Sequence, residues 1–129
     1  MSSDRPLKIK IQILCGDEIA MGPGKADLLD AIRDHGSISA AGRALGMSYR
    51  RTWLLVDAMN RCWTERLVDT VPGGGQARGA TVTRTGEAIL SAYRAMQAAA
   101  DDAASPTMTR DIERLLLPAP RPGDATPPS

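Results

Sequence analysis

Four consecutive residues, Ser48-Tyr49-Arg50-Arg51, carry the chemistry that stands out most in the sequence. A serine here can cap a helix, because its hydroxyl oxygen accepts a hydrogen bond from a free backbone amide of the first turn. The positive end of the helix dipole and two guanidinium groups then attract phosphate, and an arginine can donate two hydrogen bonds to the edge of a guanine. The four residues therefore predict contact with DNA, and a solvated helix face is the alternative.

Charge is distributed unevenly along the chain. The whole sequence holds 16 Lys and Arg against 15 Asp and Glu, a net charge of +1 that by itself indicates no polyanionic partner. Between residues 33 and 84, however, eight arginines stand against four acidic residues, whereas three arginines stand against five acids from Asp101 onward. The positive part contains Arg50 and Arg51, which supports a nucleic-acid interface there. Arg43 and Arg61 are further candidates in the same part, again with a solvated face as the alternative.

Two glycine-rich segments invite comparison with phosphate-binding loops. Neither Gly22-Pro23-Gly24-Lys25 nor the segment 73–79 has the spacing of a nucleotide-binding P-loop. The second segment lies between two predicted strands, so we interpret it as the tip of a hairpin. Gln76 and Arg78 would there contact a phosphate or the minor groove, which positions a protein on DNA without specifying much sequence.

Metal and enzyme chemistry have few residues to use. The chain has one histidine, His35, and two cysteines, Cys15 and Cys62, without a partner at zinc-ligand spacing. We interpret the cysteines as small apolar residues and His35 as an ordinary residue at a helix end. Since the sequence also offers no nucleophile beside a base, no carboxylate pair and no cofactor loop, we expect no enzyme, no metal and no cofactor.

The segments that must position these side chains begin with a predicted hairpin. Apolar residues alternate with polar ones over 7–13, which is typical of a half-buried strand, and a return strand is expected near 19–21. A helix follows over 24–34, with Pro23 in its first turn. Two later strands, 67–71 and 80–83, form a second hairpin around the glycine-rich loop.

Two further helices are expected between residue 34 and the second hairpin. Ser37 is expected to cap a helix that runs through Leu45, Gly46 to allow a tight turn, and Ser48 to cap a helix that ends near Trp63. Small residues Ala41 and Gly42 would let these helices approach closely. The periodicity places one stripe of the longer helix in the core, namely Thr52, Val56, Met59 and Trp63. Trp53 is one step away and either faces the DNA groove or packs under the second hairpin, and packing is favoured. Tyr49 either reaches DNA or covers the first helix.

A long helix is expected from 83–85 to about 104, and its alanine-rich face favours close packing with another helix. Six of the nine prolines fall in the last 24 residues, which indicates a disordered tail from about Leu117. A short helix over 107–117 precedes it, and its docking against the rest of the chain is left open. The predicted organisation is a flexible start over 1–6, one domain over 7–104 and a proline-rich tail over 105–129.

The order of these elements predicts an α+β fold, mainly α: a winged helix-turn-helix with an N-terminal β-hairpin and a long C-terminal dimerisation helix. Several segments resemble the N-terminal, DNA-binding domain of the ModE family over residues 7–100. The segments are Gly22-Pro23-Gly24-Lys25, Gly36-Ser37-Ile38-Ser39, Gly46-Met47-Ser48-Tyr49-Arg50-Arg51-Thr52-Trp53, Met59-Asn60, Leu67-Val68 and Ala80-Thr81-Val82-Thr83 with Gly86. Gly42 departs from that resemblance, because alanine is commoner there, and the loop after Pro72 is shorter than in many members.

The resemblance implies a bacterial transcription regulator with a LysR-like winged helix-turn-helix that dimerises on palindromic DNA. Full-length members add molybdate-binding domains, and nothing after Ala104 resembles them, so the chain looks like a stand-alone form and molybdate binding is not carried over to any residue. The candidate DNA-binding residues are Ser37, Ser48, Tyr49, Arg50, Arg51, Gln76 and Arg78.

We therefore expect a cytoplasmic, homodimeric regulator that binds double-stranded DNA and is related to molybdenum by resemblance alone. The sequence has no apolar run long enough to span a membrane and no signal peptide. The alternative is a protein-interaction module that keeps the winged fold, pairs with a longer regulator and does not bind DNA itself.

Overall fold

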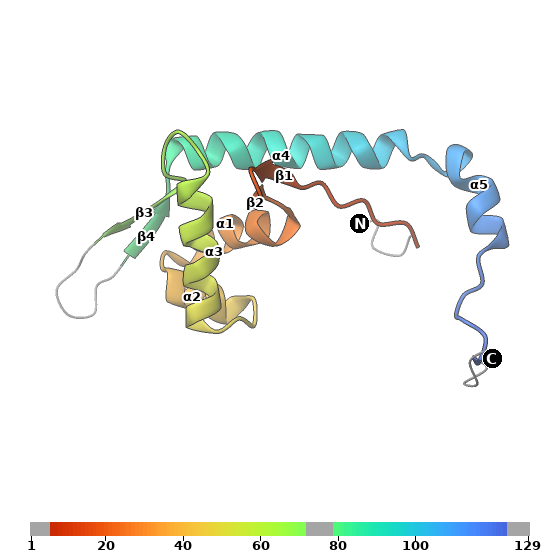
Figure 1. Ribbon diagram of the computed structural model, residues 1–129, viewed down its shortest axis with the longest axis horizontal. Helices are drawn as coiled ribbons and strands as arrows, with labels where there is room; N and C mark the ends of the chain where they lie inside the picture. Colours follow the sequence, from red (N-terminus) through yellow and green to blue (C-terminus); the bar gives the residue numbers. More distant parts are fainter. Residues whose placement is uncertain (1–5, 72–78, 124–129) are drawn as a thin grey trace.

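The computed structural model describes residues 6–71 and 79–123, and it is mainly helical with two small antiparallel hairpins (Figure 1). The elements, in chain order, are β1 (Ile13–Cys15), β2 (Glu18–Met21), α1 (Pro23–His35), α2 (Ile38–Ala44), α3 (Tyr49–Arg61), β3 (Val68–Val71), β4 (Gly79–Val82), α4 (Arg84–Ala103) and α5 (Pro106–Leu115). Helices α1, α2 and α3 form one body with β3 and β4 at its side, as in a winged helix-turn-helix. The predicted fold class is confirmed.

The first hairpin is shorter than the alternating pattern predicts. β1 pairs with β2 in the register Leu14 with Ile19 and Cys15 with Glu18. The prediction of a strand over 7–13 is wrong, because β1 contains only residues 13–15. The partner strand β2 has four residues, so residues 7–12 have no strand to pair with. That segment is instead attached to α4, since the Tyr93 hydroxyl donates a hydrogen bond to the Ile11 carbonyl oxygen at 2.7 Å.

The predicted caps of the helix-turn-helix are confirmed. Ser37 accepts a hydrogen bond from the Ala40 amide, and Ser48 accepts one from the Arg51 amide. The turn between α2 and α3 uses Gly46 at φ 70°, a backbone conformation that a residue with a Cβ rarely adopts. These local features fix where α3 begins, and so which residues occupy its first turn.

The core lies where α1, α3 and α4 meet the second hairpin. Its largest fully buried side chains are Tyr93, Met21, Leu28, Leu29, Ile32, Met59, Leu67, Val56, Val68 and Thr52. Asn60 fastens the end of α3 to β3, since its side-chain oxygen accepts from the amides of Leu67 and Val68. α3 ends at Arg61, two residues before the expected Trp63, which is half-buried against the core and donates to the Ala20 carbonyl.

The second hairpin joins the helical body through its inner strand. β3 and β4 pair from Val68 with Val82 to Val71 with Gly79, and the Ala80 amide donates to the Gly36 carbonyl at the end of α1. The loop between these strands lies outside the described residues, and with it Gln76 and Arg78. The contacts expected of these two side chains therefore stay a prediction.

Helix α4 begins inside the domain and continues beyond it (Figure 1). Thr83 caps it, and its buried residues are Gly86, Leu90 and Tyr93, all in its first half. The expected short helix is confirmed as α5, which lies at the far end of α4 with Met108, Ile112 and Leu115 exposed, so it does not dock on the domain. No helix of the described part of the chain is long and apolar enough to span a bilayer. The domain limits at 7 and 104 stay predictions.

Candidate nucleic-acid interface

The first turn of α3 presents charged and aromatic side chains to solvent. Tyr49 is 54% exposed, and Arg50 and Arg51 are exposed beside it. Among the described residues, the guanidinium groups of Arg50 and Arg51 have no acidic partner. The Ser48 hydroxyl caps the helix, since it accepts a hydrogen bond from the backbone amide of Arg51 at 3.1 Å. The positive charge and the donors of both arginines are thus free for a ligand, at the helix end where the dipole also favours an anion.

Trp53 belongs to the same surface, which corrects the expectation that it packs under the second hairpin. Its side chain is 37% exposed, and its ring lies edge-on to Tyr49 with the centroids 6.1 Å apart. The stripe that starts at Thr52 faces inward, so Trp53, about 100° around the helix, faces away from the core. Tyr49 likewise contacts Trp53, and the alternative in which it covers α1 is not supported.

The opposite side of α3 is held tightly against α2. Thr52 is fully buried, and its hydroxyl donates to the Ser48 carbonyl at 2.7 Å. A Cβ built on Gly42 would lie 3.1 Å from Thr52 Cβ and closer still to its hydroxyl oxygen. The two helices therefore approach as closely as the predicted small residues allow, which gives the exposed first turn a rigid support.

Other arginines of the positive segment are engaged elsewhere. Arg61 donates to Asp57 at 2.9 Å and to Glu18 at 3.0 Å, and the hydrogen bond with Asp57, more than any other contact, raises the pKa of Arg61. Because Arg61 lies at the far end of α3 and its charge is compensated by two acids, it is not among the residues proposed to contact DNA. Arg43 is exposed on α2 and donates to the Ser39 hydroxyl, and it has no acidic partner in the described structure.

Ser37 lies at the start of α2, half-buried, with its hydroxyl oxygen accepting from the Ala40 amide at 3.0 Å. Ser37 therefore acts as the N-cap of α2. A contact between Ser37 and a phosphate, which the sequence also suggests, remains a prediction.

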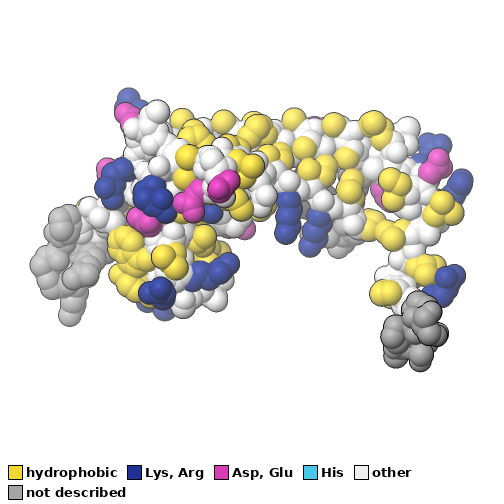
Figure 2. All heavy atoms as spheres, viewed as in Figure 1, with side chains coloured by type: hydrophobic (Ala, Val, Ile, Leu, Met, Phe, Trp, Pro, Cys, Tyr) yellow, Lys and Arg dark blue, Asp and Glu magenta, His cyan; other side chains and the backbone are white. Residues whose placement is uncertain are grey.

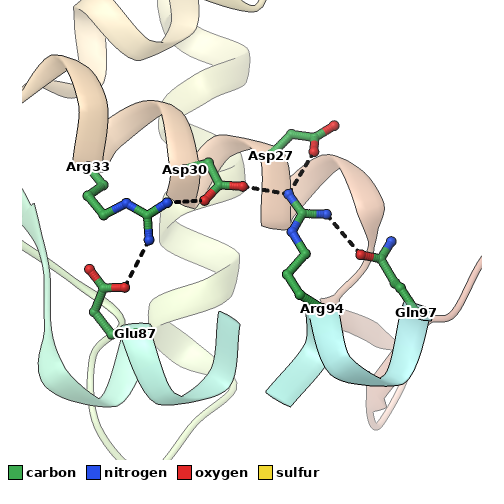
Figure 3. Close-up of polar contacts among 6 residues, drawn as sticks. All are labelled: Asp27, Asp30, Arg33, Glu87, Arg94 and Gln97. Carbon is green, nitrogen blue, oxygen red and sulfur yellow. Dashed lines mark hydrogen bonds and ion pairs between the residues drawn. The ribbon is translucent and has the colours of Figure 1, made fainter. Parts of the chain in front are cut away.

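An ion-pair cluster connects α1 to α4 (Figure 3). Asp30 accepts from Arg33 and from Arg94, each at 2.6 Å, and Arg33 also donates to Glu87 on α4. Arg94 donates to Asp27 as well, at 3.0 Å. Burial alone would lower the pKa of Arg94, but its hydrogen bonds to Asp30 and Asp27 outweigh burial and raise it. No pattern of residues predicts this cluster, which fixes the long helix to the domain that carries α3.

Both cysteines are free thiols. Cys15 is exposed on β1, and Cys62 is half-buried at the end of α3. Burial, followed by a hydrogen bond with Cys15, raises the pKa of Cys62, which disfavours the thiolate that nucleophilic or metal chemistry requires. In the described ranges, no group of three His, Cys, Asp or Glu side chains converges as metal ligands.

Comparison with known proteins finds relatives among molybdenum-related proteins. The chain is 44% identical over 78 residues to the molybdenum-pterin-binding protein MopB of Rhodobacter capsulatus, covering 60% of this chain and 29% of that protein. It is 30% identical over 97 residues to MopA of the same organism, covering 75% of this chain and 37% of MopA. It is also 30% identical over 93 residues to the DNA-binding transcriptional dual regulator ModE of Escherichia coli K12, covering 72% and 34%.

A solved structure is similar to the chain in fold. The full-length LysR-type regulator LysG of Corynebacterium glutamicum, with bound effector Arg, matches with a TM-score of 0.50 and 27% sequence identity. The match covers 72% of this chain and 30% of the LysG chain. No protein-family model matches the chain. The chain spans about a third of the length of the curated relatives it matches, and the match lies in their N-terminal part. Over this winged helix-turn-helix domain, the chain is a homologue of the ModE, MopA and MopB proteins of the ModE family.

Proposed function

We propose that the protein is a sequence-specific, DNA-binding transcription regulator that places the first turn of α3 in the major groove. The observation that carries the proposal is the pair Arg50 and Arg51, exposed and without an acidic partner in the described structure, in the first turn of α3. A helix that reads base edges must present its N-terminal turn and be held rigidly from behind, and α3 meets both requirements. No catalytic role is part of the proposal.

Each exposed side chain has a role that its chemistry suits. Arg50 and Arg51 would donate to guanine edges or to phosphates, and Ser48 and Ser37 lie at helix starts where phosphates bind. Tyr49 and the edge of Trp53 offer an apolar contact for a thymine methyl group. Gln76 and Arg78, which follow β3 in the sequence, would contact a phosphate or the minor groove of the same DNA.

The protein would act as a homodimer through α4. Beyond the domain, this helix exposes a stripe of apolar residues that begins near its middle, namely Ala92, Ala95, Met96 and Ala99 (Figure 2). Because the cluster around Asp30 ties α4 to α1, the dimer would set the distance between two α3 helices. Each α3 would then contact one half of a palindrome, with the halves one helical turn of DNA or a multiple of it apart.

The relatives' names connect this regulator to molybdenum. We therefore propose that it acts in the cytoplasm on genes of molybdenum metabolism. Molybdate itself is not proposed as a ligand, because no residue of this sequence resembles the molybdate-binding domains of full-length members.

Selection of random DNA duplexes on the purified protein tests the proposal. The selected sequence and a scrambled control are then titrated over a salt series with the wild-type protein, with Arg50→Ala and with Arg114→Ala as the matched control. Arg114 is also exposed but lies on α5 and pairs with Asp111. We expect a palindrome, and a loss of specific binding for Arg50→Ala alone. Enrichment of no sequence, with weak binding at all salt concentrations, would instead favour the protein-interaction module.

A further inference from the structure

An open pocket of about 430 Å³ lies beside the first turn of α3. Its walls come from the segment before β1, from the start of α1 and from the turn that leads into α3. Three cationic side chains line the pocket. Lys10 comes from the segment before β1, Lys25 from the first turn of α1 and Arg51 from the first turn of α3. The pocket is thus a place where segments far apart in the sequence bring positive charge together.

The charge in this pocket is not compensated. In the described structure, Lys10, Lys25 and Arg51 form no ion pair. The acid that lines the pocket, Asp27, accepts a hydrogen bond from Arg94 on α4 at 3.0 Å, so its charge is partly neutralised from outside. Three free cations around one cavity favour an anionic ligand.

The start of α1 adds to this preference. Gly22 has no side chain to cap the helix, the first turn holds no acid, and a Cβ on Gly24 would meet nothing within 4 Å. The backbone at this wall is therefore open toward a ligand. The motif Gly22-Pro23-Gly24-Lys25 fails as a nucleotide-binding loop, but Gly24 leaves space here that a side chain would occupy.

The remaining wall is apolar. Ile19, Leu45, Met47 and Leu55 line the pocket beside the cations, and the volume is within the usual range of small-molecule sites, about 300 to 1,000 Å³. Inorganic anions need no such surface, whereas an organic anion buries its apolar part against it.

We propose that this pocket binds a small organic anion, a phosphate or carboxylate group with an apolar body, and that the anion regulates DNA binding. The charged group would lie among Lys10, Lys25 and Arg51, and the apolar body against Met47 and Leu55. Arg51 belongs both to this pocket and to the first turn of α3, so a bound anion would withdraw it from DNA. The regulatory part rests on the proposed DNA-binding function, whereas the binding part does not.

Phenyl phosphate is a suitable probe, with inorganic phosphate for comparison, because the two share a charged group and differ in the apolar body. Amide signals of the full-length protein are followed by NMR at constant ionic strength. We expect saturable shifts at Gly24 and Lys25, with tighter binding of phenyl phosphate. Lys25→Gln should weaken that binding about tenfold, the effect of losing one charge-assisted contact. Lys8→Gln is the matched control, since Lys8 is exposed on the same segment as Lys10 but does not line the pocket.

A DNA titration separates a free anion from a phosphate of the DNA backbone. If the ligand is a free anion, phenyl phosphate weakens DNA binding of the wild-type protein, and Lys25→Gln binds DNA normally but no longer responds. If Lys25→Gln instead weakens binding to all DNA sequences and lowers the salt dependence, the pocket holds a DNA phosphate and the regulatory proposal is overturned. Shifts that do not saturate, or that are equal in Lys25→Gln and Lys8→Gln, overturn the site itself. A protein that binds phenyl phosphate but no DNA keeps the site and loses the proposed function.

Discussion

Gly42 of α2 faces Thr52 of α3 so closely that no side chain fits between them. A Cβ added at Gly42 would lie 3.1 Å from Thr52 Cβ and 3.3 Å from its Cγ2, and nearer still to Oγ1. The threonine cannot turn aside freely, because it is fully buried and its hydroxyl bonds to the Ser48 carbonyl. This pair therefore fixes the separation of the two helices on which the exposed arginines depend.

Gly42→Ala is expected to destabilise the protein, although alanine is favoured over glycine in helices by about 1 kcal/mol. Overpacking of a tight contact costs about 1 to 3 kcal/mol, which exceeds that gain. In a Thr52→Ala background, which lacks Oγ1 and Cγ2 but keeps Cβ, the same substitution should cost less. Urea unfolding of the four proteins gives the coupling energy of the pair, and a value near zero would contradict the close contact.

Arg50→Ala and Arg51→Ala are each expected to weaken binding to the selected palindrome by about 1 to 3 kcal/mol if the side chain contacts a base. An arginine that contacts only phosphate should instead weaken binding to all sequences alike and lower the salt dependence. Fluorescence anisotropy over a salt series separates the two. Unchanged affinity for both variants would place the DNA contact outside the first turn of α3.

The elements around this site follow from the sequence where local chemistry decides them. Ser37, Ser48 and Gly46 are predictable because a cap or a positive φ depends on the residue itself and its near neighbours. Trp53 was misplaced because an apolar residue one step from the buried stripe can pack or stay exposed, and only the tertiary contacts decide.

Contacts between residues far apart in the chain are the least predictable from this sequence. Arg61 and Arg50 are alike in type and both lie on α3, yet Arg61 pairs with Glu18, 43 residues away, and Arg50 pairs with none of the described acids. The cations of the pocket, Lys10, Lys25 and Arg51, are also separated in the chain, by 15 and 26 residues. No periodicity or spacing predicts such encounters, because the fold creates them.

Asp30→Asn is expected to lower the free energy of unfolding by about 1 kcal/mol, because one carboxylate serves both Arg33 and Arg94. The groups are partly exposed, so added salt should reduce the difference. Asp57→Asn is the matched control: it breaks an exposed surface pair with Arg61 inside α3 and should cost less, since Arg61 keeps its pair with Glu18. Equal losses in both variants would show that the cluster adds nothing beyond ordinary surface pairs.

Tyr93 makes the stability of the domain sensitive to alkaline pH. Its ring is fully buried on α4, and burial raises the pKa of its hydroxyl above the usual 10.0. The unfolded chain then loses the proton first, so the stabilisation is complete below about pH 10 and declines as the pH rises toward the pKa of the folded state. In a Tyr49→Phe background Tyr93 is the one remaining tyrosine, and its phenolate absorbance reports that pKa directly.

Tyr93→Phe separates this effect from other alkaline titrations. The variant should lose about 1 kcal/mol at neutral pH, because the Ile11 carbonyl loses the hydrogen bond that attaches the segment before β1 to α4. Lysines titrate alike in both proteins, so the gap between wild type and Tyr93→Phe should narrow as the pH rises above about 10, where ionisation of Tyr93 favours the unfolded wild-type chain. Denaturant unfolding at a series of pH values measures the gap. A gap that stays constant would mean that Tyr93 ionises as easily in the folded protein as in the unfolded chain.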